Sequence, residues 1–249
     1  MSLVYKVILI ILICKSPSLC RWLVKLLRCM LWVFKDMRHN IKLRKKGKVV
    51  FNRYGLTMFV GRQGEGKTIS LVNYALSLKK QYPGLKIYAN FDLSFADGQI
   101  NYLNELLTLR NGEDGILFLI DELQNEFSTV ASKTFPESLL STITMQRKQR
   151  IHIATTSQVF MRVAKPLREQ CFEVVECRTF FHRWTSCRAY DAIDYNMVCE
   201  SSNPDKKYKL PKKWKLSFIQ TDELRNCYDT FEVVQRLSRQ GFAEKMLPR

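Results

Sequence analysis

The chain has 249 residues, of which 46% are hydrophobic and 25% charged, a size and composition that suit one sizeable α/β domain with appendages. Its formal net charge of +17 is unevenly placed: residues 1–53 contain thirteen Lys or Arg and one acid, Asp36, whereas the rest contain 27 bases and 22 acids. The eight cysteines form no CxxC pair and the three histidines have no metal-ligand spacing with them, which excludes the usual structural zinc sites.

The N-terminal region, residues 1–46, has the pattern of a membrane-associating segment. Residues 3–14 are almost wholly apolar but too few to span a bilayer as one helix, and no small-x-small site suits a cleaved signal peptide. Residues 19–35 predict a cationic amphipathic helix with tryptophans at headgroup level, and residues 35–48 add a polybasic tail. An anionic membrane surface is therefore the expected partner. The alternatives are packing on the rest of the chain or on a neighbouring subunit, and direct contact with DNA.

The sequence VGRQGEGKT, residues 60–68, fits the phosphate-binding loop of nucleotide-hydrolysing proteins. In such a loop, backbone N–H groups and the N-terminus of the next helix surround the phosphates, while Lys67 reaches the outer phosphates and Thr68 helps to hold Mg²⁺. Residues 56–60 predict the strand before the loop, and residues 69–80 predict the helix after it. ATP and Mg²⁺ are thus the expected cofactors. The expected binding residues are Gly61, Gln63, Gly64, Glu65, Gly66, Lys67, Thr68 and Ile69.

A buried strand predicted at residues 116–120 ends in two acids. The carboxylate after such a strand lies at the same sheet edge as the loop, so Asp121 is expected to hold the Mg²⁺ water shell. Glu122 is expected to orient and deprotonate the attacking water, which indicates hydrolysis rather than transfer to another acceptor. The alternative is that these acids only cap the following helix.

Between the loop and the acids, residues 86–89 predict a further strand and residues 100–110 a connecting helix. An extra strand between the two nucleotide motifs, with Glu122 beside the Mg²⁺ aspartate, is typical of additional-strand, catalytic-glutamate motors. The expected fold is therefore α/β, a RecA-like P-loop NTPase core with a mainly parallel sheet. Because such an ATPase works in a reducing cytosol, all eight cysteines are interpreted as free thiols.

After the acids, residues 137–145 predict a helix and residues 151–157 the next strand. Gln158, at the tip of that strand, is expected to contact both the γ-phosphate and the water held by the catalytic glutamate. A basic cluster precedes the strand, and in a ring of subunits Arg147 or Arg150 would reach a neighbour's γ-phosphate and stabilise the charge of the transition state. The alternative for this cluster is a solvated helix end.

The order of these motifs, from the loop through FLIDE at 118–122 to QRKQRIHIATTSQ at 146–158, resembles the FtsK–HerA superfamily of DNA-pumping ATPases. Within that superfamily it resembles the zonula-occludens-toxin-like ATPases of filamentous and other small phages. The resemblance covers about residues 56–194. It implies a RecA-like core, a hexameric ring, ATP-driven movement of DNA and a part in virion morphogenesis or export. It assigns to the loop, the two acids and Gln158 the roles given above.

Filamentous-phage assembly ATPases typically carry a transmembrane helix and an extra domain after the ATPase, whereas here the apolar segment comes first. This difference favours a DNA-translocating or genome-packaging motor at the cytoplasmic face of the host cell membrane, or one associated with the virion. The strandedness of the DNA stays open. The alternatives are a membrane-bound assembly or export ATPase of the filamentous-phage type and a nucleotide-dependent scaffold.

Residues 171–181 and 185–195 predict a β-hairpin at the edge of the sheet, whose turn would present Arg183 and Trp184 outward. Residues 203–217 contain several lysines with two prolines and predict a flexible basic linker. The expected organisation is a membrane-associating segment at 1–46, a P-loop ATPase core at 47–200, and a basic linker with a C-terminal element at 201–249.

Overall fold

The computed structural model describes residues 17–45, 49–100, 105–126, 146–201 and 209–229. The chain divides into two compact units between Val49 and Val50, close to the boundary expected at residues 46 and 47. Predictions for residues 1–16 and for a helix at 137–145 lie outside the described residues. The cysteines that the structure describes are all free thiols.

The first unit contains one helix, α2 (Pro17–Lys45), of 29 residues. The predicted amphipathic helix is thus present and continues through most of the polybasic tail. Its large apolar side chains are exposed, Trp22 at 59% and Leu31 at 72%. The Lys35 ammonium lies 4.5 Å from the ring centroid of Trp32, within cation–π distance. Across the described residues, no helix combines the length and the apolarity needed to cross a membrane.

The second unit is built from strands, short helices and one long helix. Its strands are β1 (Gly55–Val60), β2 (Lys86–Ala89), β3 (Asp92–Leu93), β4 (Gly98–Gln99), β5 (Ile116–Ile120), β6 (Ile151–Ser157), β7 (Cys171–Phe180), β8 (Trp184–Asp191), β9 (Lys212–Ile219) and β10 (Tyr228–Asp229). Its helices are α3 (Lys67–Gln81), α4 (Glu105–Thr108), η1 (Gly112–Asp114), α5 (Leu123–Glu126), α7 (Gln146–Gln149), η3 (Phe160–Arg162), α8 (Lys165–Glu169), α9 (Ala192–Glu200) and α10 (Asp222–Arg225).

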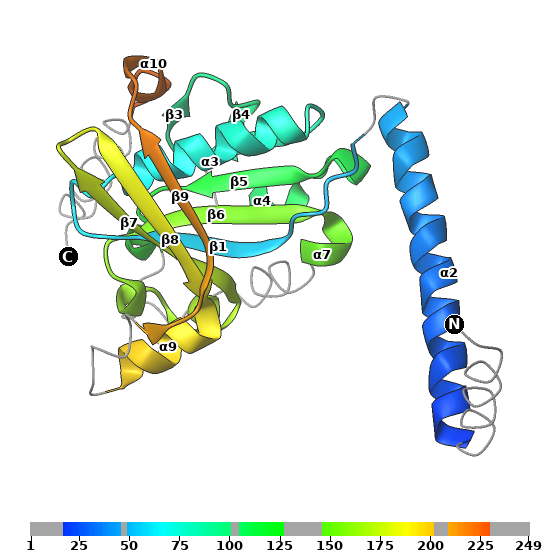
Figure 1. Ribbon diagram of the computed structural model, residues 1–249. Helices are drawn as coiled ribbons and strands as arrows, with labels where there is room; N and C mark the ends of the chain where they lie inside the picture. The colour runs from blue at the N-terminus through cyan, green and yellow to red at the C-terminus, as the bar shows by residue number, and fades with distance from the viewer. Residues whose placement is uncertain (1–16, 46–48, 101–104, 127–145, 202–208, 230–249) are drawn as a thin grey trace, which may run out of the picture. The chain divides into compact units, whose positions relative to one another are not determined.

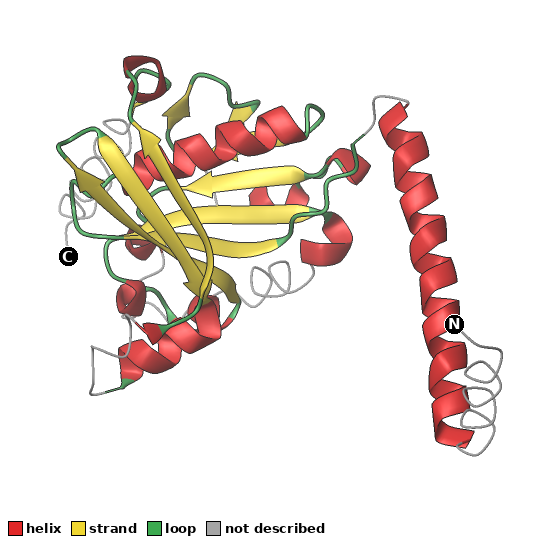
Figure 2. Cartoon of the chain, in the orientation of Figure 1, coloured by secondary structure: helices red, strands yellow, loops and turns green. Residues whose placement is uncertain are grey.

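Eight strands form one sheet in the order β4-β2-β5-β6-β1-β7-β8-β9, and β3 pairs with β10 separately. The pairs from β4 to β7 are parallel, whereas β8 and β9 are antiparallel to their neighbours. Helix α3 lies on one face of the sheet and α9 on the other (Figure 1), so the layers are helix, sheet and helix (Figure 2). The expected α/β, RecA-like core with a mainly parallel sheet is confirmed.

The central strands β1, β5 and β6 are buried at every position, which explains the unbroken apolar run of β5 and the mainly apolar start of the other two. Because side chains alternate along a strand, neighbouring residues enter different cores. Met58 packs in the core on the side of α9, where Tyr195 lies, whereas Phe59 packs in the core that contains Leu71 of α3. The sheet is therefore held from both sides, and its strand ends are fixed in position.

The position of the additional strand differs from the expectation. β6 lies between β1 and β5, whereas β2, the strand predicted at residues 86–89, pairs with the outer side of β5. The inserted strand is therefore the one that follows the two acids in the sequence, not the one that precedes them. The sequence order could not show this, because a crossover connection returns a later strand to any free place in a parallel sheet.

The hairpin formed by β7 and β8 is confirmed, but it does not lie at the edge of the sheet. β9 pairs with β8 and takes the edge, so the prediction of a flexible linker at residues 203–217 is wrong for residues 212–217. Trp214 and Phe218 of this strand pack against the core on the side of α3, which explains why a lysine-rich segment is ordered. Residues 203–208 of the predicted linker lie outside the described residues. β8 also ends earlier than predicted, where the Asp191 side chain caps α9.

Candidate nucleotide-binding site

Three parallel strands bring the predicted site residues to one edge of the sheet. In the register of the sheet, Val60 at the end of β1 pairs with Ser157 at the end of β6, and Ile120 of β5 pairs with Thr155 of β6. The segments that follow these strands are the phosphate-binding loop, the two acids and Gln158. Because the carboxyl ends of parallel strands share an edge, these segments meet there.

The loop between β1 and α3 has the backbone that phosphate binding requires. Gly64 has φ 81° and Gly66 has φ 79°, a left-handed conformation that glycine adopts without strain. The Arg62 N–H donates to the Glu65 carboxylate at 2.7 Å, and the Lys67 ammonium donates to the Arg62 carbonyl at 3.3 Å. The predicted binding residues all lie in this loop or in the first turn of α3: Gly61, Gln63, Gly64, Glu65, Gly66, Lys67, Thr68 and Ile69.

Asp121 lies against the start of α3, as predicted for a Mg²⁺ aspartate. The Thr68 hydroxyl donates to Asp121 Oδ1 at 3.0 Å, and the Thr156 hydroxyl donates to the same oxygen at 2.6 Å. Burial raises the pKa of Asp121, and the charge of Glu122 adds to this, although the two hydroxyl hydrogen bonds and the charge of Lys67 oppose the rise. A buried carboxylate of this kind gains stability when a cation approaches it.

The pair formed by Thr68 and Asp121 fits Mg²⁺. Both side chains offer oxygen atoms, the ligands that Mg²⁺ prefers, and their oxygens lie 3.0 Å apart. Mg²⁺ in nucleotide sites commonly takes one or two protein ligands and fills its other positions with water and phosphate oxygens. Within the described ranges, no cluster of three or more His, Cys, Asp or Glu side chains forms an all-protein metal site.

Glu122 lies between the loop and the tip of β6. Its backbone has φ 54°, an uncommon and strained conformation for a residue other than glycine, and its N–H donates to the Thr156 hydroxyl at 2.8 Å. Glu122 Oε1 lies 4.0 Å from the Lys67 ammonium. Glu122 Oε2 accepts hydrogen bonds from the side-chain amides of Gln124 and, at 3.5 Å, of Gln158. The lysine, the glutamate and the predicted sensor glutamine therefore converge.

Two residues that sequence reasoning missed hold the aspartate in place. The Asn90 side chain accepts from the Asp121 N–H at 2.8 Å and donates to the Asp121 carbonyl at 3.2 Å. Asn90 directly follows the parallel strand β2, and Gln158 was identified by the same signal, a polar residue directly after a predicted strand. Thr156, which contacts both acids, gave no such signal, because nothing in the sequence distinguishes it from its neighbour Thr155.

A polar cluster of two buried side chains and one half-buried side chain supports the loop from the side of the hairpin. The support cluster consists of Thr179, Thr185 and Gln220. The two threonine hydroxyls lie 3.0 Å apart, and the Gln220 amide donates to Thr185 at 2.7 Å and to Thr179 at 3.3 Å. Arg225 of α10 in turn donates to the side-chain amide oxygen of Gln220 at 2.7 Å. The cluster joins the ends of β7, β8 and β9 beneath Gly66.

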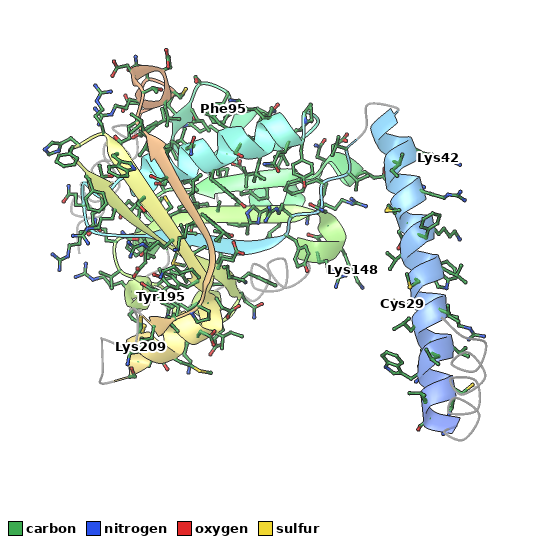
Figure 3. The ribbon with its side chains drawn as sticks, in the orientation of Figure 1. Cys29, Lys42, Phe95, Lys148, Tyr195 and Lys209 are labelled. Atoms are coloured by element: carbon green, nitrogen blue, oxygen red, sulfur yellow. The ribbon has the colours of Figure 1, made fainter. Side chains whose placement is uncertain are left out.

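The structure does not bring the two candidate arginine fingers to this site. Lys148 of α7 lies at the edge where β5 and β6 begin (Figure 3), opposite to the edge that holds the loop. On either side of it, Arg147 lies 5.6 Å from the ring centroid of Tyr54, and Arg150 donates to the Phe51 carbonyl at 3.1 Å. Each arginine thus has a contact within its own chain. Action at a neighbour's phosphate needs a second subunit and stays a prediction.

A cavity of about 550 Å³ adjoins the loop on the side of α9. Gly61 and Gln158 border it at one end, and Arg178 and Arg188 of the hairpin line its wall. Tyr195 of α9 (Figure 3) also lines it. The cavity therefore extends from the candidate catalytic residues to the basic face of the hairpin.

No family model matches the chain, and no curated protein matches it. Its fold is similar to that of the N-terminal domain of zonular occludens toxin from Neisseria meningitidis, with 13% identity and a TM-score of 0.54 over 71% of this chain and 99% of that chain. The genome packaging NTPase B204 from Sulfolobus turreted icosahedral virus 2, in complex with AMPPCP, has 12% identity and a TM-score of 0.46 over 66% of this chain and 91% of that chain.

At these identities the likeness concerns the fold. The chain shares the fold of the zonular occludens toxin domain, in agreement with the resemblance that the order of its motifs indicated. The roles of individual residues rest on the geometry of the site itself.

Proposed function

We propose that this chain is an ATPase that uses ATP hydrolysis to move DNA, in viral genome packaging or virion morphogenesis. The observation that carries the proposal is the convergence of two side chains from the first turn of α3 with the two acids that follow β5. Thr68 contacts Asp121 at 3.0 Å, and Lys67 lies 4.0 Å from Glu122. Binding of a triphosphate and activation of water need these groups in one place.

Each residue has a distinct task in hydrolysis. The backbone N–H groups of the loop and of the first turn of α3 bind the phosphates, and Lys67 stabilises charge on the terminal one. Thr68 and Asp121 would hold Mg²⁺, which neutralises phosphate charge when bound. Glu122 accepts the proton of the attacking water, and Gln158, 3.5 Å from the Glu122 carboxylate, orients that water and senses the phosphate.

The coupling to DNA is supported by the order of the motifs and by the charge of the chain. The loop, the acid pair and the strand that ends in Gln158 follow one another as in DNA-pumping ATPases. Outside residues 1–53 the chain still carries more bases than acids, 27 against 22, which suits a polyanionic partner. We propose a homo-oligomeric, hexameric ring, in which Arg147 or Arg150 of one subunit acts at the phosphate of the next.

The test is the ATPase rate of the purified chain with and without single- and double-stranded DNA, together with the particle mass. A DNA motor hydrolyses ATP faster when DNA is added. An ATPase rate that does not change when DNA is added contradicts the motor and favours an export or assembly ATPase of the filamentous-phage type.

Replacement of Glu122 by Gln should lower turnover about 100-fold or more while ATP binding persists. The exposed Glu113, replaced by Gln, is the matched control. A wild-type chain that binds ATP without hydrolysing it would indicate a nucleotide-dependent scaffold.

We also propose that residues 1–46 bind the anionic surface of the host membrane on its cytoplasmic face. The support is α2, a helix rich in lysine and arginine whose apolar side chains are exposed, among them Trp22, Leu27 and Leu31 at 59%, 60% and 72%. Apolar insertion and a polybasic patch together give the two signals that stable anchoring needs. Association with the virion would be a second location for the same chain.

Flotation with vesicles tests the membrane proposal. The full chain should bind vesicles that contain anionic lipid better than neutral vesicles, and salt should weaken this binding. A chain that starts at Lys46 should lose it. Equal partitioning of the two chains contradicts anchoring by the N-terminal segment.

A further inference from the structure

The turn between β7 and β8 has an unusual composition for its geometry. The Arg183 N–H donates to the Phe180 carbonyl at 3.2 Å, which closes a four-residue turn. Its two central residues, Phe181 and His182, have φ of 50° and 56°. A hairpin turn with two left-handed residues normally contains Asn and Gly, because a Cβ makes this conformation unfavourable by about 1–2 kcal/mol per residue.

Phe181 adds a second unfavourable feature to this turn. Its side chain is 86% exposed, the highest value among the exposed large hydrophobic residues of the described chain. A phenylalanine in this position contributes nothing to the core and adds strain to the backbone. A strained backbone that carries a largely exposed aromatic side chain indicates that this side chain contacts a partner outside the fold.

The surface beside the turn combines aromatic and basic side chains. Phe180, Trp184 and Ile219 are directly opposite one another on three neighbouring strands and are 36%, 48% and 59% exposed. Further along the same face, Arg178 and Arg188 line the 550 Å³ cavity. The Arg178 guanidinium lies 5.2 Å from the ring centroid of Phe180.

The charge of this face is positive. Lys215 of β9 is paired in register with Arg188, so three cations lie on one face of the three strands. Among the described residues, none of these three cations forms an ion pair with a carboxylate. Two acids also line the cavity, and each accepts a hydrogen bond: Glu65 from the Arg62 N–H at 2.7 Å, and Glu176 from the Tyr195 hydroxyl at 2.9 Å. An aromatic tip beside a basic groove is the arrangement that binds an unpaired nucleic-acid strand.

We propose that the turn at Phe181 and the adjoining basic face bind single-stranded DNA. A base stacks on the Phe181 ring, and the phosphates of the strand lie along Arg178, Arg188 and Lys215. Stacking needs the open face of a base, which a paired duplex does not offer, so the geometry favours a single strand. This inference rests on the proposed function and names the strandedness of its DNA.

The turn is also joined to the phosphate-binding loop. Gln220 binds the turn through its backbone, since its N–H donates to the Arg183 carbonyl at 2.7 Å and its carbonyl accepts from the Arg183 guanidinium at 2.9 Å. The Gln220 side chain belongs to the support cluster, which lies directly beneath Gly66. A DNA strand bound at the turn is therefore connected to the nucleotide site through one residue, Gln220.

Binding of a fluorescent oligothymidylate to the full chain in detergent micelles tests the proposal, with a duplex of the same length beside it. Replacement of Phe181 by Ala should weaken binding of the single strand about tenfold or more, since base stacking on an aromatic ring contributes roughly 1–3 kcal/mol. Replacement by Tyr should preserve it. Ile193, which is 63% exposed on α9 at the other end of the hairpin, gives the control variant Ile193→Ala.

A double variant separates binding from folding. Phe181→Asn with His182→Gly introduces the preferred turn residues, so the melting temperature should rise while single-strand binding falls as in Phe181→Ala. Unchanged single-strand affinity in both variants overturns the proposal. An equal loss of affinity for the single strand and for the duplex also overturns it. A change of particle mass in these variants would overturn it as well, because the turn would then be a contact between copies of the chain. If the wild-type chain binds no DNA and its ATPase rate ignores DNA, the proposed function itself fails.

Discussion

Gly66 and Thr179 touch across the boundary between the phosphate-binding loop and the hairpin. A Cβ built on Gly66 would lie 2.5 Å from Thr179 Oγ1, closer than such atoms approach, and 3.2 Å from both Thr185 Oγ1 and Gln220 Nε2. The glycine is therefore required twice, by its left-handed backbone and by the support cluster behind it. Gly64, two residues earlier, has the same backbone conformation, but a Cβ there would meet no atom within 4 Å.

The two glycines give a matched pair of variants. Gly64→Ala should lower the free energy of unfolding by about 1–2 kcal/mol, the cost of a left-handed alanine. Gly66→Ala should cost about 1–3 kcal/mol more, because the methyl group also displaces Thr179. It should weaken ATP binding more strongly as well. Thermal unfolding and titration with a fluorescent ATP analogue measure both effects, and equal behaviour of the two variants would contradict the assigned contact.

Thr155 and Thr156 are neighbours in β6 with opposite expected effects. Thr156→Val removes hydrogen bonds to both acids, so ATP turnover should fall about tenfold or more while the chain still binds ATP. The Thr155 hydroxyl is buried and has no hydrogen-bond partner among the described residues. Thr155→Val should therefore leave turnover unchanged and keep or raise stability. Steady-state kinetics and melting temperatures decide, and a larger kinetic effect at Thr155 would refute the geometry.

The buried Asp121 should limit the stability of the nucleotide-free chain. Because burial raises its pKa in the folded state, its contribution to stability is greatest below the unfolded pKa and is lost as pH rises through the folded pKa. Asp121→Asn should thus raise the melting temperature at neutral pH without nucleotide and should abolish Mg²⁺-dependent turnover.

Asp97 provides the control of opposite sign. Burial alone would raise its pKa, but hydrogen bonds from Lys79 and from the Ile87 N–H lower the pKa overall. Its stabilisation is present above the unfolded pKa and is lost as pH falls through the folded value. Asp97→Asn should therefore lower the melting temperature at neutral pH. A fall of the melting temperature in Asp121→Asn would show that the Asp121 carboxylate is not destabilised by its surroundings.

His152 should make the fold sensitive to acid. Its ring is buried between the Tyr74 hydroxyl and the Gly55 carbonyl, each at 3.0 Å, and burial lowers its pKa to about 4. The unfolded chain binds a proton near pH 6.5, so stability is fully present above that value and declines as pH falls towards 4, by on the order of 3 kcal/mol. Urea unfolding across this range should show a flatter pH dependence for His152→Gln than for wild type. His39→Gln, on the exposed α2, should keep the wild-type slope.

Much of the candidate site was predictable because its signals are local. The glycine spacing and Lys67 lie within one short loop, and Asp121 and Glu122 end one apolar run. A strand, a loop and a helix in this order require no distant partner to be recognised. The same holds for Gln158, since a polar residue after a buried parallel strand lies at the edge where ligands bind.

The errors arose where distant segments pair. β6 inserts between two strands that precede it in the chain, and β9 covers the hairpin although its lysines and the prolines before it indicated a linker. Whether a lysine-rich segment becomes a strand depends on the apolar surface offered to Trp214 and Phe218, which is formed by residues far away in the sequence.

The sequence by itself indicated the candidate chemistry: which loop has the spacing for phosphate binding, which acids follow a strand, and which end of the chain is basic and apolar. Only the tertiary structure decided that Thr156 rather than Thr155 contacts the acids, that Thr179 and Gln220 lie beneath Gly66, and that Phe181 projects from a strained turn. The reason is physical. Residue type and spacing fix local conformation and reactivity, whereas the register and order of strands follow from the burial of apolar surface shared by distant segments.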